Sequence, residues 1–251
     1  MPATISDGSA DAGKYRQAQR GLTRLLLRDA GRLRRLIIPS RLQVTIPEWM
    51  AAMNQVIAHY GETSASLAAE FYDAQRAAAG VTEAFQVPLP DSPPAEQVDN
   101  SLRWATKDLW PRDPEDPKTT DAQRQPIESR LEEAGKKADA VAQKLVTDQG
   151  RDTVQRAVAK DRQATAWARS AALGACAFCK LLSSRGAVFK QDTVEFRAHD
   201  GCHCMALPVF KGQRFELSPH AREWDRIYRE YAAPYPGDQL RRFRRAIAEH
   251  G

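Results

Sequence analysis

Apolar residues recur at helical spacing along most of the first 172 positions. Over residues 12–38 they return at steps of three, four and seven, and Pro39 ends the pattern. A second amphipathic stretch covers residues 48–79, with Pro47 suited to its first turn. The same spacing over residues 95–109 and 121–172 predicts further helices. The pattern therefore predicts a mostly α protein with an elongated helical arm over residues 12–172.

The interruptions of this pattern suggest how the arm is divided. Residues 1–11 are small and polar, which favours a disordered tail, and the alternation over residues 42–46 predicts a short extended bridge. Prolines among polar residues near 85–95 and 111–120 predict hinge loops. Gly150 is expected to separate two helices, the second of which runs into Cys176.

The pattern changes after residue 172. Short apolar runs at 187–189, 193–196 and 205–210 predict strands of a small antiparallel sheet within residues 173–212. In residues 213–251, Ser218 followed by Pro219 predicts the start of one helix, and Asp238 caps a last one. The expected fold is a helical region followed by a small α+β module and C-terminal helices.

All four cysteines lie in this module, as a C-x2-C pair (Cys176, Cys179) and a C-x-C pair (Cys202, Cys204). Two convergent thiolate pairs provide the tetrahedral soft-ligand set that Zn²⁺ prefers. His199 adds a further donor three residues before Cys202. The spacing therefore predicts that a zinc ion staples the α+β module.

The ligand set stays open at this point. Cys176, Cys179 and Cys202 are the favoured ligands, with His199 or Cys204 as the fourth, and His203 is expected to point away. Two disulfides or free buried thiols are the alternatives, and a reducing compartment disfavours the disulfides. A thiolate-rich site is usually closed, so the expected zinc is structural, not catalytic.

Basic residues form two candidate contact surfaces. Arginines at intervals of four follow one side of the first helix, and a dense cluster lies in the last helix. Each set is typical of either a solvated helix face or a contact with DNA or an acidic partner. The candidate contact residues are Arg16, Arg20, Arg24, Arg28, Arg241, Arg242, Arg244 and Arg245. The mixed charges of residues 121–172, by contrast, predict ordinary solvated helix surface.

The formal net charge of +5 permits a nucleic-acid or acidic partner without requiring one. The N-terminal segment lacks the basic and apolar regions of a signal peptide, and no stretch reaches the roughly 20 apolar residues of a membrane helix. We therefore expect a protein of the reducing cytoplasm with no membrane partner.

The cysteine segment CAFCKLLSSRGAVF, followed by FRAHDGCHC and the apolar exit through Pro208, Val209 and Phe210, resembles the Mu F-like minor head proteins of tailed phages. The similarity is strongest to the actinobacteriophage branch, known as head-morphogenesis or minor capsid proteins, and covers about residues 165–212. It implies a virion protein whose partners are the portal protein, the major capsid protein and packaged DNA. It also implies assembly in the host cytoplasm and a final location in the capsid interior.

Catalytic motifs are missing from the sequence. There is no G-x-S-x-G elbow, Walker A loop, dinucleotide fingerprint or H-E-x-x-H motif. We expect a non-enzymatic structural protein. The alternatives are a capsid maturation protease, a label that some members of the resembling branch carry, and a zinc-stabilised nucleic-acid-binding protein outside any phage.

Overall fold

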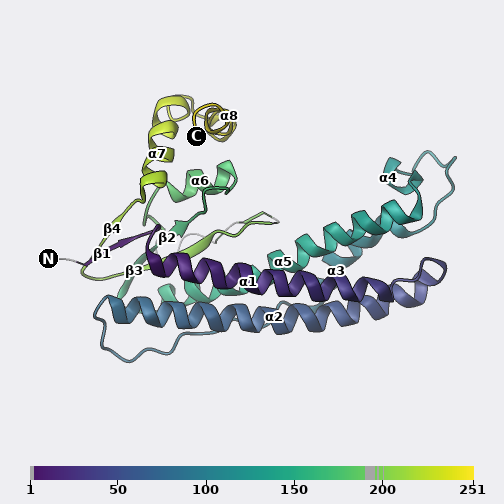
Figure 1. Ribbon diagram of the computed structural model, residues 1–251, viewed down its shortest axis with the longest axis horizontal. Coiled ribbons are helices and arrows are strands. Elements are labelled where there is room, and N and C mark those ends of the chain that lie inside the picture. Colours follow the sequence, from purple (N-terminus) through teal and green to yellow (C-terminus); the bar gives the residue numbers. More distant parts are fainter. Residues whose placement is uncertain (1–2, 190–195, 197, 200) are drawn as a thin grey trace. The chain divides into compact units, whose positions relative to one another are not determined.

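The computed structural model describes residues 3–189, 196, 198–199 and 201–251. Helices carry most of these residues, as the sequence pattern predicts, and the strands are short (Figure 1). The α-helices are α1 (Ala10–Leu33), α2 (Leu42–Ala78), α3 (Ala95–Thr106), α4 (Asp121–Arg124), α5 (Ile127–Lys160), α6 (Ala177–Ser183), α7 (Pro219–Tyr231) and α8 (Gln239–His250). Single 3-10 turns are η1 (Arg34–Leu36), η2 (Pro39–Arg41) and η3 (Lys107–Leu109). The strands are β1 (Ala3–Ser6), β2 (Ala164–Ser170), β3 (Met205–Phe210) and β4 (Gln213–Glu216).

The chain divides into two compact units that are discontinuous in sequence. The first unit contains residues 1–20, 65–90 and 150–251, and the second contains residues 21–64 and 91–149. Helices α1, α2 and α5 each contribute residues to both units. Each unit therefore combines separate stretches of the sequence, whereas consecutive segments were expected from the sequence.

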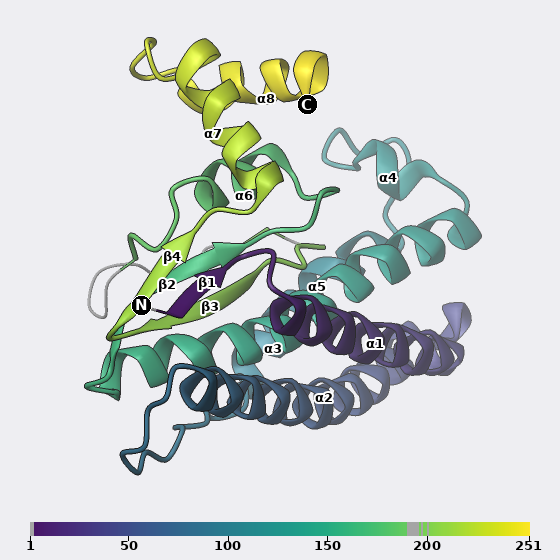
Figure 2. The ribbon, with the colours of Figure 1, turned by 60° about the vertical axis from the view of Figure 1, so that its left-hand side comes forward.

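Two short sheets form the first unit's β structure. Strands β2 and β3 pair antiparallel, with Trp167 opposite Pro208, and the Trp167 amide also donates to the Phe189 carbonyl at 2.9 Å. Strands β1 and β4 pair in parallel, from Ala3 opposite Gln213 to Ser6 opposite Glu216. Figure 2 shows α7 and α8 gathered beside α6, next to these sheets. The segments that carry the cysteines thus begin or end at ordered elements of this unit.

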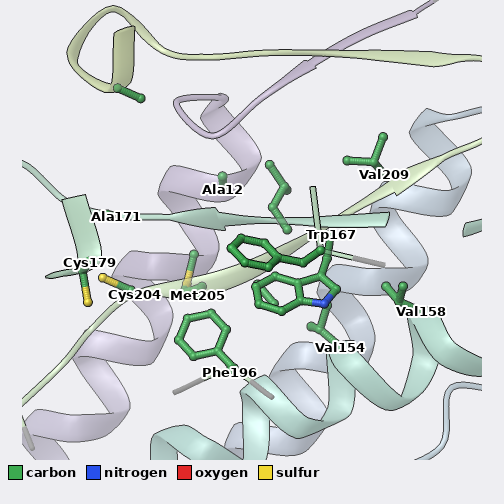
Figure 3. Close-up of a cluster of buried hydrophobic side chains, with 14 of the residues drawn as sticks. Ala12, Val154, Val158, Trp167, Ala171, Cys179, Phe196, Cys204, Met205 and Val209 are labelled. Carbon is green, nitrogen blue, oxygen red and sulfur yellow. The ribbon is translucent and has the colours of Figure 1, made fainter. Parts of the chain in front are cut away.

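An aromatic core supports these strands. The Trp167 ring stacks on Phe189 and on Phe196, with centroid distances of 4.3 and 5.4 Å (Figure 3). Val154 and Val158 from α5 are fully buried in the same cluster, which also includes Cys179 and Cys204. Burying this apolar surface is the main favourable contribution to the unit's folding.

The second unit packs helices against one another. Its buried residues include Trp49 and Met53 of α2, Leu102 of α3 and Ala142 of α5. A polar contact also joins α1 to α2, because the Tyr60 hydroxyl of α2 donates to the Asp29 carboxylate of α1 at 2.6 Å. Mixed apolar and polar contacts of this kind set which helix faces meet.

Four expectations about individual segments were wrong. Of the tail expected to be disordered at 1–11, the described residues 3–11 are ordered, because β1 pairs with β4 and α1 begins at Ala10. Residues 42–46 belong to α2, and not to an extended bridge, because Leu42 and Ile46 lie one helical turn apart and are both buried; Pro47 lies inside that helix. Helix α5 continues through Gly150, since a single helical glycine costs only about 1 kcal/mol and packing offsets it. No helix runs into Cys176, because β2 occupies residues 164–170.

Other expectations were confirmed. The proline-rich segments near 85–95 and 111–120 contain no helix or strand up to Pro94 and Thr120, where α3 and α4 begin. The strand expected at 205–210 is β3, and α7 and α8 match the two C-terminal helices. Of the strand expected at 187–189, only Phe189 forms a β-bridge. The strand expected at 193–196 lies outside the described residues except for Phe196.

Candidate metal centre

The two cysteine pairs stand at the ends of regular elements. Cys176 is the N-cap of α6, and its sulfur accepts the Cys179 amide at 3.5 Å. This cap places Cys179 in the first turn, so that both thiols face the same side. Cys202 and Cys204 lie just before β3, and the amide of Cys204 donates to the Cys202 sulfur at 3.5 Å. A helix start and a strand start therefore present the four sulfurs.

The donor atoms form two groups that share Cys179. Cys176, Cys179 and His199 form one group, and Cys179, Cys202 and Cys204 form the other, with all atoms of each group within 4.8 Å of one another. The Cys179 and Cys202 sulfurs are 3.4 Å apart, and His199 Nε2 is 2.8 Å from the Cys176 sulfur. Zinc–sulfur bonds of about 2.3 Å give sulfur separations of about 3.8 Å in a tetrahedron. The residues therefore fit a bound zinc ion after small shifts.

Burial and hydrogen bonding set the protonation of the thiols. Cys179, Cys202 and Cys204 are buried, whereas Cys176 is partly exposed and all four thiols are free. The Cys202 pKa is lowered, because its sulfur accepts hydrogen bonds from Cys179 and Cys204 and lies near Arg151. The Cys179 pKa is raised, because its thiol donates to Cys202 and Cys204 and is desolvated. Burial raises the Cys176 pKa, but hydrogen bonds from the Cys179 amide and His199 outweigh burial and lower it.

Two buried arginines support the cluster. Arg151 of α5 donates from Nε to the Cys204 carbonyl at 3.0 Å and from Nη2 to the Cys202 carbonyl at 2.6 Å. Arg169 of β2 lies 3.6 Å from the Cys179 sulfur, and its guanidinium covers the Phe196 ring at 3.7 Å. A tetrathiolate zinc site carries two net negative charges, which these two cations would neutralise. The expectation that residues 121–172 form solvated surface was wrong for both arginines.

His203 belongs to neither group of donor atoms. It lines a cavity of about 270 Å³ beside the cysteines, together with Arg20 and Gly201. Burial lowers its pKa, as do Arg20 and Arg151. His203 is therefore a neighbour of the cluster and serves as a non-ligand control.

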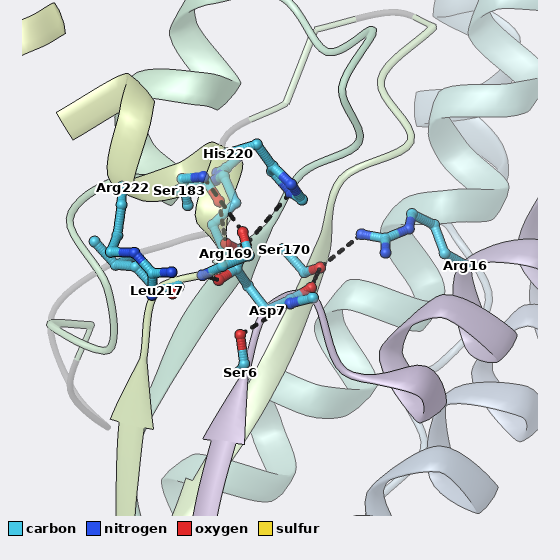
Figure 4. A network of polar contacts seen from close by, with 12 residues as sticks. Ser6, Asp7, Arg16, Arg169, Ser170, Ser183, Leu217, His220 and Arg222 are labelled. Atoms are coloured by element: carbon cyan, nitrogen blue, oxygen red, sulfur yellow. Dashed lines mark hydrogen bonds and ion pairs between the residues drawn. The ribbon is translucent and has the colours of Figure 1, made fainter. Parts of the chain in front are cut away.

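The predicted arginines of α1 lie in different surroundings. Arg16 is partly buried and donates to the Ser170 hydroxyl at 2.7 Å (Figure 4). Burial lowers the pKa of Arg16, and the neighbouring Arg20 lowers it further. Arg20, Arg24 and Arg28 are exposed, and Arg28 pairs with Asp29 at 3.2 Å. Arg16 is thus a structural contact, and the exposed side chains remain candidates for a partner surface.

The arginines of α8 are all exposed. Arg241 makes two hydrogen bonds to the Asp238 carboxylate, at 2.7 and 2.8 Å. Arg242 pairs with the same carboxylate at 3.5 Å, and its guanidinium carbon lies 3.6 Å from the Tyr235 ring centroid. Arg244 and Arg245 complete this exposed basic surface around the buried Phe243.

Serine hydroxyls near histidine or the cysteines have structural partners. Ser183 donates to the Arg169 carbonyl at 2.7 Å, and Ser184 donates to the Leu181 carbonyl at 2.9 Å. Ser218 donates to Asp7 at 2.7 Å, while His220 lies 3.9 Å from that same carboxylate oxygen. A serine triad instead places histidine between serine and the acid. Ser218 therefore serves as the N-cap of α7, and His220 lies in the first turn of that helix, which is not the arrangement of a serine triad.

A comparison with protein families gives a match over most of the chain. Within the described part of the chain, no helix combines the length and apolar character needed to cross a membrane. Neither the curated proteins nor the solved structures gave a match. The family model described as VG15 protein matches residues 7–232. Since this match covers most of the sequence, including the cysteine cluster, the chain belongs to the VG15 protein family, a family of phage gene products.

Proposed function

We propose that this phage protein is a structural minor head protein, associated with the portal and acting in capsid assembly and DNA packaging. Its family and the resemblance of its cysteine segment to Mu F-like minor head proteins support this role. The portal protein and the major capsid protein would be its partners. The exposed arginines of α8 would face packaged DNA, whose phosphates attract such a surface. The protein would assemble in the host cytoplasm and remain inside the capsid.

The observation that supports a metal site in this protein is that two groups of donor atoms, one with Cys176 and His199 and one with Cys202 and Cys204, share Cys179. We propose that they bind a structural zinc ion through Cys176, Cys179 and Cys202, with Cys204 or His199 as the fourth ligand. Such a site would join the start of α6 to the start of β3. Metal binding free energy in sites of this kind is folding free energy, so the ion would hold this segment rigid.

Quantitative mass spectrometry of purified virions and of assembly intermediates tests the head role. We expect the intact protein at low copy number in both kinds of particle. Its absence from all particles would contradict the proposal. Cleavage of the major capsid precursor on co-expression with this chain, abolished by one serine or histidine substitution, would assign it a protease role instead.

Elemental analysis of the purified protein tests the metal site. We expect one zinc per chain, with Cys179→Ala losing the metal because Cys179 belongs to both donor groups. His203→Ala is the matched control and should keep the metal. His199→Ala and Cys204→Ala identify the fourth ligand, since only loss of a true ligand releases zinc. Unchanged metal content and thermal stability in Cys179→Ala would contradict the site.

A further inference from the structure

The second unit contains a cavity of about 750 Å³ that belongs to neither the metal centre nor the arginines of α8. It lies between the first half of α2 and the segment formed by α3 and η3. Ile46 and Met50 form a buried apolar floor, and Pro47 and Ala51 are exposed beside them. A pocket of this size and character is typical of sites that bury apolar groups of a ligand.

The walls of the cavity are held in place by the unit's own contacts. Leu102 and Leu109 are fully buried and anchor α3 and η3. Arg130 donates to the carbonyls of Asp108 and Leu109 at 3.2 and 3.4 Å, which fixes the end of η3. Trp110 follows directly and lines the cavity with a half-buried ring. The cavity is therefore preformed, which lowers the entropic cost of binding.

The rim of the cavity is positively charged. Arg103, Lys107 and Arg112 line it and are exposed. Asp99 is the acid among the lining residues, and its carboxylate accepts a hydrogen bond from Asn54 at 2.7 Å. The neighbouring Asp108 pairs with Lys137 at 3.0 Å. Three cations thus surround an apolar floor, and the adjacent acids have other partners.

We propose that this cavity, bounded by Ile46, Met50, Ala51, Arg103, Lys107 and Trp110, docks an acidic peptide segment of a partner protein. One or two large apolar side chains of that segment would enter the floor, and its carboxylates would meet the cationic rim. A nucleic-acid backbone would use the rim but leave the apolar floor unfilled. Charge complementarity of this kind mainly provides specificity and a faster association rate.

Selection from a displayed library of random 12-residue peptides tests the proposal on the full-length chain. The counter-selection uses Ala51→Arg, which obstructs the cavity at an exposed position while adding positive charge. We expect enriched peptides to combine Asp or Glu with Leu, Phe or Trp, and to lose binding to Ala51→Arg. No enrichment over the obstructed variant, or enriched peptides without acids, would overturn the proposal.

A matched pair of double variants separates docking from general charge attraction. Arg103→Glu with Lys107→Glu reverses the rim, and Arg35→Glu with Lys136→Glu makes the same charge change at exposed positions outside the cavity lining. An enriched peptide should bind the rim variant about tenfold more weakly and the control variant within about twofold of the parent. Equal losses in both variants would refute a localised site. Tighter binding of an oligonucleotide than of the peptide, lost only in the rim variant, would assign the cavity to nucleic acid.

This inference is independent of the proposed head role and of the metal. The variants lie in the second unit and should retain zinc, as elemental analysis and circular dichroism would verify. Loss of peptide binding with intact metal and helix content therefore reports on the cavity alone.

Discussion

At the residue scale, single buried charges hold the first unit's segments together. The Asp7 carboxylate accepts the Ser218 amide and hydroxyl, both at 2.7 Å, and the Asp7 carbonyl accepts the Ser170 hydroxyl at 2.8 Å (Figure 4). Arg151 plays a similar part at the cysteines, where it binds two backbone carbonyls. Removing one partner from such a contact leaves a buried polar group unsatisfied.

Asp7→Ala should lower the free energy of unfolding by about 2–4 kcal/mol, because it leaves the Ser218 amide buried without its acceptor. Asp11→Ala is the control, since the exposed Asp11 only pairs with Lys14 at 3.6 Å. That substitution should change stability by less than about 0.5 kcal/mol. Urea unfolding of the two variants checks the difference, and similar losses in both would contradict the role of Asp7.

Arg151→Met should weaken zinc binding about 10- to 100-fold, the usual cost of losing a partner that orients metal ligands. The physical reason is that the carbonyls of Cys202 and Cys204 lose the cation that positions their turn. Arg156→Met changes an exposed arginine of the same helix and should leave zinc affinity unaltered. Competition with a chromophoric chelator measures both. An Arg151→Met affinity equal to that of the control would exclude this support.

At the element scale, two helical glycines differ in the space beside them. An added Cβ at Gly21 of α1 would meet its nearest neighbour, the end of Arg24, at 4.0 Å. At Gly135 of α5 it would lie 2.8 Å from Arg34 Nε, where that side chain contacts Asp139 and the Gly135 carbonyl. The same substitution therefore has different consequences in the two helices.

Gly21→Ala should raise the free energy of unfolding by about 0.5–1 kcal/mol, through the lower entropy of the unfolded chain. Gly135→Ala should give no such gain, because Arg34 of η1 must leave its contacts with Asp139 and the Gly135 carbonyl of α5. Thermal unfolding of the two variants provides the comparison. Equal stabilisation by both would show that Arg34 moves aside without cost.

The sequence pattern predicted the long helices, but not the short helix α6 or the strands β1 and β2. Strand β2 reads ATAWARS and is buried at six of its seven positions, so it lacks the alternation that identifies a half-buried strand. Strand β1 gains its partner only from residues 213–216, which a local pattern cannot show. The grouping of the cysteines and His199 could be predicted, because metal ligands recur at short, characteristic spacings along the chain. Arg151 and Arg169 were not, because burial distinguishes them from other arginines only after folding.

At the scale of the whole molecule, helices and the metal centre should respond differently to metal removal. Helices α1, α2, α3 and α5 have their own buried faces, whereas the described parts of residues 176–210 hold the cysteines and little regular structure before β3. A bound ion would therefore stabilise mainly this segment of the first unit.

Chelation of the metal should leave most of the far-ultraviolet helix signal while changing the near-ultraviolet signal of Trp167. That ring stacks on Phe189 and Phe196, and Phe196 lies three residues before the donor His199 in the sequence. Circular dichroism during titration with a chelator, with zinc added back afterwards, checks this prediction. Loss of helix signal in parallel with zinc would show that the ion supports the entire protein.

The bond between the Asp7 carboxylate and the Ser218 amide joins residues 211 positions apart. During translation, β1 and Asp7 leave the ribosome long before β4 and Ser218 exist. The first unit can therefore complete its fold only after residue 218 has been synthesised. Until then, β1 and Asp7 lack the strand and the serine that they contact in the folded protein. Pairing over such a separation slows folding. Nascent chains arrested before residue 213 should be cut by protease within residues 3–9, and chains arrested well beyond residue 218 should resist.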